Sequence, residues 1–149
     1  MSHAHAVAAR DKKQADAEAV GIDEAFISVL VEDFYALIRK DTLLGPVFAE
    51  RITDWPHHLA RMKAFWRSVL HKSGEFSGNP MVKHIAIPKI GMPEFAHWLK
   101  LFAQTLEGMG AAPDARALVT MRAEMIAESL LMGIRIHRDG ITDPDKMKG

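Results

Sequence analysis

The chain has 149 residues, of which 48% are hydrophobic and 26% are charged. These values are typical of one compact globular domain and exclude disorder over the whole chain. The 19 basic residues balance the 19 acidic ones, so we expect no nucleic-acid partner, because a neutral chain offers little attraction to a phosphate backbone.

Residues 1–20 carry almost no large apolar side chains. They cannot bury enough surface to offset the entropic cost of ordering, so we expect a flexible N-terminal extension. The folded domain is predicted over residues 21–138, and a polar C-terminal tail is predicted over residues 139–149.

The first helix is predicted from Asp23, a good N-cap, to Lys40. Its apolar residues recur at helical spacing and are Ile27, Leu30, Val31, Phe34, Leu37 and Ile38. Residues 41–46 then break the helix, because they contain a glycine followed by a proline. Phe48 comes just after this break and can fold back under the helices.

The second helix is predicted to begin at Asp54, which is followed by Pro56 in the first turn, and to end near Gly74. The residues expected to face inward are Leu59, Met62, Phe65, Trp66, Val69 and Leu70. A polar loop over residues 73–80 leads to a short helical segment that ends before Pro88.

Two further helices are predicted, one from Pro93 to just before Gly108 and one from Pro113 to about His137. The first is expected to bury Phe95, Trp98, Leu99, Phe102 and Leu106. The second has Leu118, Val119, Met125, Ile126, Leu130 and Ile134 available for packing. No stretch shows the alternation of a strand, so the predicted fold class is all-α.

The chain contains no cysteine, which excludes disulfides and thiolate metal sites. Any metal must therefore be held by histidine or carboxylate groups. The apolar stretches are far shorter than the ~20 residues of a membrane span, and residues 1–13 lack the apolar core of a signal peptide. These features predict a cytoplasmic protein that does not bind membranes.

His84 lies between Pro80 and Pro88 in a short segment whose neighbouring side chains are largely apolar. An imidazole without a partner is costly in such surroundings. The residues alone leave two interpretations open, a core histidine bonded to a backbone carbonyl or an axial ligand to the metal of a flat cofactor. Spacing alone favours the core histidine.

Three more residues are candidates for a site. His58 lies on the same face of the second helix as Met62 and Phe65, so its ring faces apolar groups. Tyr35, the only tyrosine, is either a boundary residue or a hydrogen-bond donor in a pocket. Trp98 is either a core residue or a second donor, because a buried indole N–H needs an acceptor.

Five segments follow one another along residues 23–136. They are VEDFYALIRKD with Tyr35, LGPVFAE with Phe48, WPHHLARMKAFW with His58, NPMVKHIAIP with His84, and EFAHWLKLF with Trp98. Their order and approximate spacing resemble the group III truncated haemoglobins. No single segment is diagnostic, but five in order are hard to obtain from an arbitrary helical bundle.

The resemblance implies a two-on-two helical sandwich around haem b, with His84 as the proximal iron ligand. Tyr35 and Trp98 would donate hydrogen bonds to a diatomic ligand on the opposite, distal side of the haem, and His58 would control access to it. The cofactor-binding residues implied in this way are His84, Phe48, His58, Arg61, Met62, Phe65 and Trp98. Arg61 would bind a haem propionate, although a solvated surface charge fits its position equally well.

The implied function is the binding of dioxygen, nitric oxide or carbon monoxide at five-coordinate haem iron by a monomer. Hydroxyl and indole donors stabilise dioxygen more than carbon monoxide because dioxygen bound to ferrous haem carries more negative charge. Two or three such donors would slow oxygen release roughly ten- to several-hundred-fold. Two alternatives remain: a haem enzyme that converts nitric oxide or reduces peroxide with a reductase still to be identified, and a cofactor-free helical interaction module.

Overall fold

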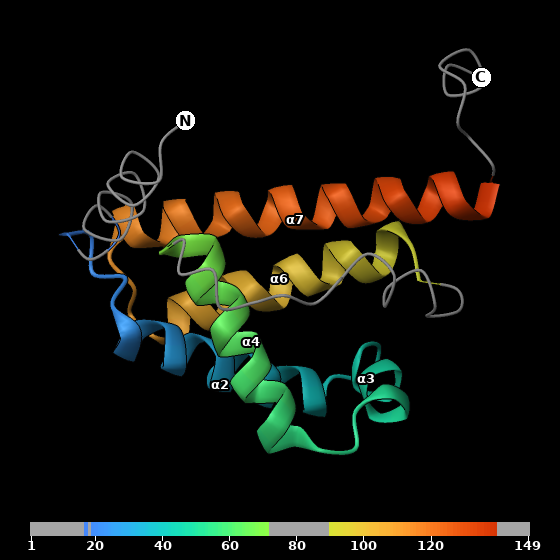
Figure 1. Ribbon diagram of the computed structural model, residues 1–149, viewed down its shortest axis with the longest axis horizontal. Helices are drawn as coiled ribbons and strands as arrows, with labels where there is room; N and C mark the ends of the chain where they lie inside the picture. Colours follow the sequence, from blue (N-terminus) through green and yellow to red (C-terminus); the bar gives the residue numbers. More distant parts are fainter. Residues whose placement is uncertain (1–16, 18, 72–89, 140–149) are drawn as a thin grey trace, which may run out of the picture.

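The computed structural model describes residues 17, 19–71 and 90–139, and these residues form helices and no strand. The helices are α2 (Glu24–Lys40), α3 (Gly45–Arg51), α4 (Trp55–Leu70), α6 (Met92–Gly108) and α7 (Pro113–Asp139). α2 packs against α3, α4 and α6, and α6 packs against α7. Figure 1 shows the resulting arrangement, in which α6 and α7 run side by side, α2 lies below them, and α4 runs steeply across α2. The predicted all-α class is confirmed.

Side-chain caps begin two of these helices as predicted. The Asp23 carboxylate accepts a hydrogen bond of 2.8 Å from the backbone N–H of Phe26, at the start of α2. The Asp54 carboxylate accepts one of 3.1 Å from His57, at the start of α4. Each cap pairs an N–H that has no partner within the helix. α4 ends at Leu70, earlier than predicted.

The helix α3 was not predicted, because its first two residues, Gly45 and Pro46, are typical of a break between helices. Its first residue, Gly45, lies so close to the end of α2 that a Cβ atom there would come within 3.2 Å of the carbonyl oxygens of Ile38 and Arg39. Such a contact is tighter than most Cβ atoms make, so any side chain at this position would push the two helices apart by a few tenths of an ångström. Because Gly45 has no side chain, α3 packs closely against α2, and Phe48 on α3 lies beside Tyr35 on α2.

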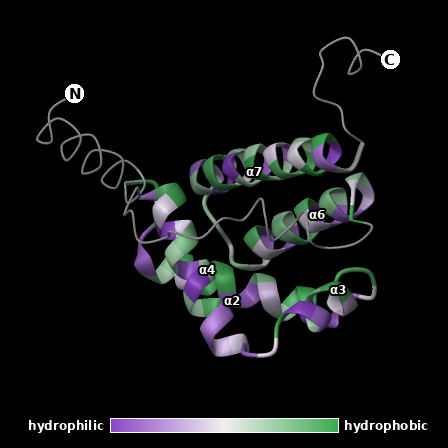
Figure 2. Ribbon diagram, turned by 45° about the vertical axis from the view of Figure 1, so that its right-hand side comes forward, coloured by the Kyte–Doolittle hydropathy of each residue, from purple (hydrophilic) through white to green (hydrophobic). Residues whose placement is uncertain are grey.

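The core is divided into two hydrophobic clusters. The larger one lies between α2, α4, α6 and the first half of α7, and includes Phe34 and Phe102. The smaller one consists of Ile90, Phe95, Ala127, Leu130 and Ile134. Hydrophobic and hydrophilic residues are interspersed along each helix, as Figure 2 shows. Three partly buried residues pack against both clusters, namely Trp98, Leu99 and Ile126.

Three observations modify the predicted core. Leu37 and Met125 were expected to face inward, but they are 36% and 51% exposed. Both residues occupy positions that continue the apolar periodicity of their helix, but no described helix packs over them. Ala17, which lies within the predicted N-terminal extension, is buried in the larger cluster; residues 1–16 lie outside the described part of the chain.

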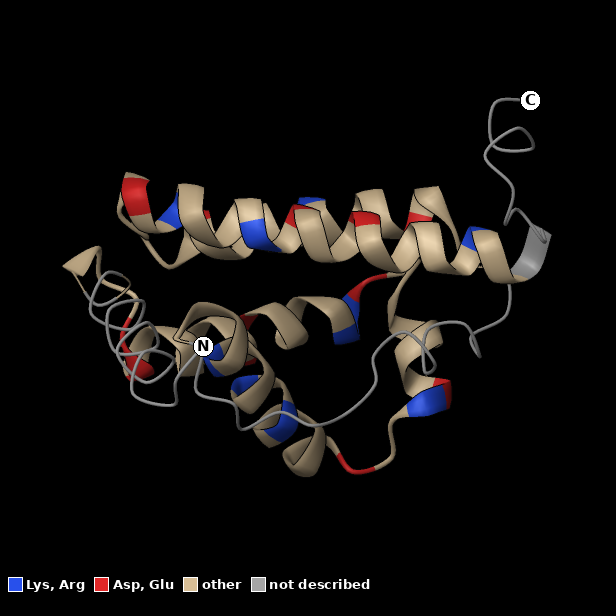
Figure 3. Cartoon of the chain, turned by 45° about the horizontal axis from the view of Figure 1, so that its top comes forward, with Lys and Arg blue, Asp and Glu red and all other residues tan. Residues whose placement is uncertain are grey.

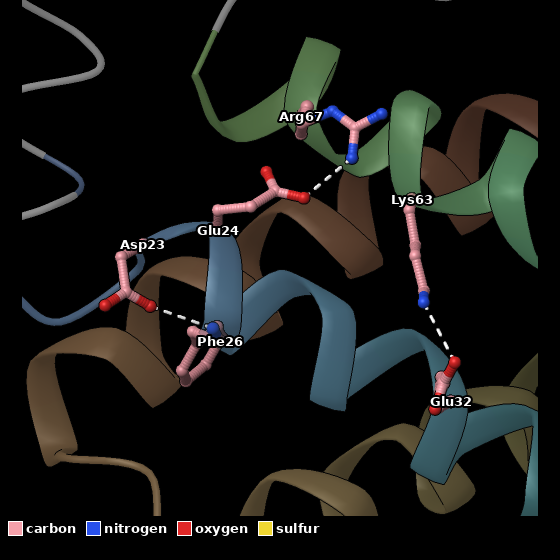
Figure 4. A network of polar contacts seen from close by, with 6 residues as sticks. All are labelled: Asp23, Glu24, Phe26, Glu32, Lys63 and Arg67. Carbon is pink, nitrogen blue, oxygen red and sulfur yellow. Dashed lines mark hydrogen bonds and ion pairs between the residues drawn. The ribbon is translucent and has the colours of Figure 1, made fainter.

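Two ion pairs connect α2 with α4 on the molecular surface. Arg67 bonds to Glu24 at 2.8 Å, and Lys63 bonds to Glu32 at 2.9 Å (Figure 4). Both glutamates are largely exposed, so each pair contributes little stability. Acidic and basic residues are interspersed along α7 without forming a stripe of one sign (Figure 3). Within the described residues, no helix is long and apolar enough to cross a membrane.

Candidate functional site

Tyr35 lies at the centre of an aromatic cluster to which three helices contribute. It is on α2 and is only 7% exposed. Its ring centroid is 5.8 Å from that of Phe48 on α3 and 4.9 Å from that of His58 on α4. The structure thus brings together three residues that the sequence singled out, although they are separated along the chain by a turn and a short helix.

Trp55 also belongs to this cluster, and sequence reasoning missed it as a site residue. Its ring centroid lies 6.1 Å from that of Tyr35 and 5.7 Å from that of His58. The Arg39 guanidinium stacks over the indole at 4.5 Å and holds it against the end of α2. The available signal was the helical spacing of Trp55, His58 and Leu59, which places all three on one face of α4.

Packing restrains the orientation of the His58 ring. The ring meets Tyr35 at an interplanar angle of 89° and Trp55 at 88°. Both are edge-to-face contacts, the arrangement that aromatic rings prefer. His58 is half-buried as a residue, and the Nε2 atom of its imidazole is buried. By contrast, the adjacent His57 is exposed.

Trp98 is connected to Tyr35 through the ring of Phe34. Its ring centroid lies 5.5 Å from that of Phe34, which lies 5.3 Å from that of Tyr35. Phe102 completes the group at 5.3 Å from Trp98. Trp98 is half-buried at the junction of the two hydrophobic clusters. The indole and the phenol therefore belong to one continuous aromatic network on α2 and α6.

Burial keeps the Tyr35 phenol neutral over a wider pH range than that of an exposed tyrosine. Removal of the phenol from water raises its pKa well above the ordinary value, because the charged phenolate loses its hydration. The side chain is therefore a neutral phenol at physiological pH. A neutral phenol can donate one hydrogen bond to a ligand that carries negative charge.

One face of α4 is apolar but incompletely covered by the described residues. Met62, Phe65 and Val69 are hydrophobic and half-buried, and they share this face with His58. On the whole helix, only Trp66 and Leu70 are fully buried. Arg61 is half-buried on the same helix. His84, the predicted metal ligand, lies outside the described residues.

These side chains fit the haem group that the sequence resemblance implies. A porphyrin requires a flat apolar wall, which the α4 face and Phe48 can provide, and a bound gas requires a few polar groups at defined positions. The phenol of Tyr35, the imidazole of His58 and the indole of Trp98 are such groups, and aromatic contacts surround each of them. The donor set thus suits a small ligand with partial negative charge.

A surface depression reaches this cluster from the side of α2. Its volume is about 210 Å³, and its lining residues are Glu32, Tyr35, Ala36, Arg39, Trp55 and Leu59. It lies between α2 and α4, so the aromatic cluster is close to solvent on this side.

Comparisons with known proteins agree with this architecture. A family model described as bacterial-like globin matches residues 17–130. The chain is 34% identical over 110 residues to the group 3 truncated hemoglobin ctb of Campylobacter jejuni, an alignment that covers 71% of this chain and 86% of that protein. It is also similar to the crystal structure of the group III truncated hemoglobin from Campylobacter jejuni, with a TM-score of 0.71 and 33% identity, covering 76% of this chain and 91% of that one.

Proposed function

This chain belongs to the bacterial-like globins and, among them, to the group III truncated haemoglobins, and on that basis we propose that it binds haem b through His84 and holds diatomic gases with high affinity. The observation that carries the proposal is the clustering of a buried phenol, an imidazole and an indole beside an apolar helix face. The gases proposed are dioxygen, nitric oxide and carbon monoxide.

His84 is the proposed proximal ligand because a neutral imidazole is the usual protein ligand of globin haem. Haem held in this way supplies an iron atom with one open coordination position for a gas. The segment that carries His84, NPMVKHIAIP, is bounded by prolines and contains several apolar residues. Such a short segment can present one ring nitrogen while its apolar neighbours face the cofactor.

Tyr35 and Trp98 are the proposed distal donors. Each would give one hydrogen bond to a ligand in the pocket, and dioxygen would gain more from these bonds than the less polar carbon monoxide. With His58 as a third donor, oxygen release would be slowed roughly ten- to several-hundred-fold. The protein would therefore retain oxygen rather than carry it in bulk.

The remaining residues are assigned by their positions on α3 and α4. Phe48, Met62 and Phe65 would pack against the porphyrin, because they are partly buried apolar side chains beside the aromatic cluster. Arg61 would bind a propionate at the edge of the haem, since a guanidinium matches a carboxylate in charge and geometry. His58 would open and close the path to the distal side by leaving its place between Tyr35 and Trp55.

Conversion of nitric oxide to nitrate is the second candidate function. The reaction combines NO with O₂ and consumes one electron, NO + O₂ + e⁻ → NO₃⁻, so each turnover requires a reductase. The slow oxygen release proposed above would favour it, because a retained oxygen molecule has time to meet nitric oxide. The donors that would cause slow release can also support peroxide reduction, since they stabilise developing negative charge.

The proposal is tested by the absorption spectrum of protein expressed with sufficient haem. We expect a Soret band in the wild type, loss of stable haem in His84→Ala, and retention in His57→Ala, a matched substitution at an exposed histidine. A colourless wild-type protein would favour the cofactor-free interaction module. Stopped-flow mixing of the oxygenated protein with nitric oxide tests the second function, which requires nitrate formation that continues when a reductant is supplied.

A further inference from the structure

A hydrogen-bonded pair of side chains joins α6 to the corner between α2 and α3. The Nε2 atom of His97 lies 2.7 Å from an Oδ1 atom of Asp41. The Asp41 side chain is 13% exposed and the His97 side chain 27%. Asp41 is the C-cap that follows the last residue of α2, whereas His97 comes 56 positions later on α6. The proposed function assigns no role to either residue.

The Asp41 carboxylate holds the corner together. Its second oxygen accepts hydrogen bonds from the backbone N–H groups of Leu43 and Leu44, at 3.0 Å and 2.8 Å. Partial burial alone would raise the pKa of Asp41, but the hydrogen bonds from His97 and from these two amides outweigh that effect and lower it. The ionised carboxylate therefore connects α6 directly to the backbone between α2 and α3.

Both ends of this connection lie next to residues of the proposed haem pocket. His97 immediately precedes Trp98 on α6. On the other side, the corner leads into Gly45, which packs closely against the end of α2, and then to Phe48. The Phe48 ring contacts Tyr35 at a centroid distance of 5.8 Å. A movement of the corner relative to α6 would thus change the position of Phe48 relative to Trp98.

We propose that His97 and Asp41 form a positioning pair, which sets the spacing between the Trp98 side and the Tyr35–Phe48 side of the distal pocket. This inference rests on the proposed function, since it assumes that these aromatic residues surround a haem-bound gas. The pair acts through its neighbours and does not itself touch the ligand. It determines how well the donors on α2 and α6 are aligned with one another.

The burial of Asp41 distinguishes this pair from the two ion pairs between α2 and α4. The carboxylate side chains of Glu24 and Glu32 are 61% and 57% exposed, against 13% for Asp41. Water and salt screen an exposed pair strongly and a half-buried one much less. Glu24 also lies at the far end of α2 from Tyr35. Glu24→Gln is therefore a matched control that removes an interhelical ion pair away from the pocket.

The test compares His97→Ala, His97→Gln and Glu24→Gln in the full-length haem protein. Two quantities are measured, the C–O stretching frequency of the carbon monoxide complex and the oxygen dissociation rate. We expect His97→Ala to shift the C–O band and to speed oxygen dissociation roughly three- to tenfold, which corresponds to partial loss of one hydrogen bond. His97→Gln, whose amide can still donate to Asp41, should restore both values, and Glu24→Gln should leave both unchanged.

A readout that needs no haem accompanies these measurements. Hydrogen exchange of the Leu43 and Leu44 amides in haem-free protein should be faster in His97→Ala than in the wild type, because Asp41 then loses the partner that fixes it. If His97→Ala does not fold, Asp41→Asn takes its place with the same expected shifts, since an amide oxygen is a weaker acceptor than a carboxylate.

Three outcomes would overturn the inference. One is an unchanged C–O band and oxygen rate in His97→Ala while wild-type protein holds haem normally, which leaves the proposed function intact. A second is faster amide exchange without any change in the C–O band, which reduces the pair to a structural contact. The third is a wild-type protein that binds no haem, which overturns the proposed function and the inference together.

Discussion

The rings of Tyr35 and His58 meet edge to face, with centroids 4.9 Å apart and an interplanar angle of 89°. The two residues come from different helices, α2 and α4, so this contact exists only because the helices cross. It places a phenol and an imidazole at one point of an otherwise apolar wall. The height of the barrier to ligand escape should depend on both groups.

Tyr35→Phe should accelerate oxygen dissociation and leave carbon monoxide dissociation nearly unchanged. The substitution removes one hydroxyl and keeps the ring that contacts Phe48 and His58. Loss of one donor to a partly charged ligand corresponds to roughly a tenfold faster release. Stopped-flow ligand replacement measures both rates. Equal changes for the two gases would show that Tyr35 acts by shape and not as a donor.

Tyr35 should remain protonated at pH values at which an ordinary tyrosine ionises. It is the only tyrosine, so absorbance at 295 nm reports its ionisation alone in haem-free protein, with Tyr35→Phe as the blank. Because folding raises its pKa, the neutral phenol contributes stability below pH ~10, and this contribution is lost as the pH rises through the higher folded-state value. We expect phenolate absorbance to appear only together with unfolding. A reversible step near pH 10 in folded protein would contradict the burial of this ring.

His71→Ala should destabilise the fold. His71 is 6% exposed, and its Nε2 lies 2.6 Å from the carbonyl oxygen of Ile22. A carbonyl only accepts, so Nε2 carries the proton in this contact. Removal of the ring leaves a buried acceptor without this donor, which costs about 1–3 kcal/mol in the free energy of unfolding. Urea denaturation measures the loss, and His57→Ala, at an exposed position, should change stability by less than about 0.5 kcal/mol.

Asp41→Asn should lower stability at neutral pH and have little effect in strong acid. Folding lowers the pKa of Asp41, so its hydrogen bonds stabilise the protein above the ordinary carboxyl value of ~3.9, and this contribution is lost as the pH falls through the folded-state value. We expect a difference of about 1 kcal/mol in unfolding free energy at pH 6. Denaturation at a series of pH values measures it. A difference that persists unchanged at about pH 2 would show that the carboxylate charge is not the cause.

Local sequence signals were sufficient for the long helices because those signals depend on neighbouring residues. The caps at Asp23 and Asp54 and the apolar periodicity of α2, α6 and α7 need no information from distant parts of the chain. The short helix α3 was missed because its first residues are a glycine and a proline, and the close approach of Gly45 to α2 is a tertiary contact that no local pattern predicts.

The candidate site could be predicted only in part. The residues themselves singled out Tyr35 and His58, and the resemblance to a family added Phe48. The structure places both Phe48 and His58 against Tyr35. Trp55 was missed, although its helical spacing to His58 places both residues on one face of α4. The pairing of His97 with Asp41 was not foreseen, because the contact joins residues 56 positions apart.

By itself, the amino-acid sequence determined the all-α class, the start of α2 and α4, and the family to which the chain is similar. Only the tertiary structure decided which apolar positions are covered, with Leu37 and Met125 exposed despite their periodicity. The physical reason is that periodicity defines one face of a helix, whereas burial and side-chain pairing depend on which other helices pack against that face.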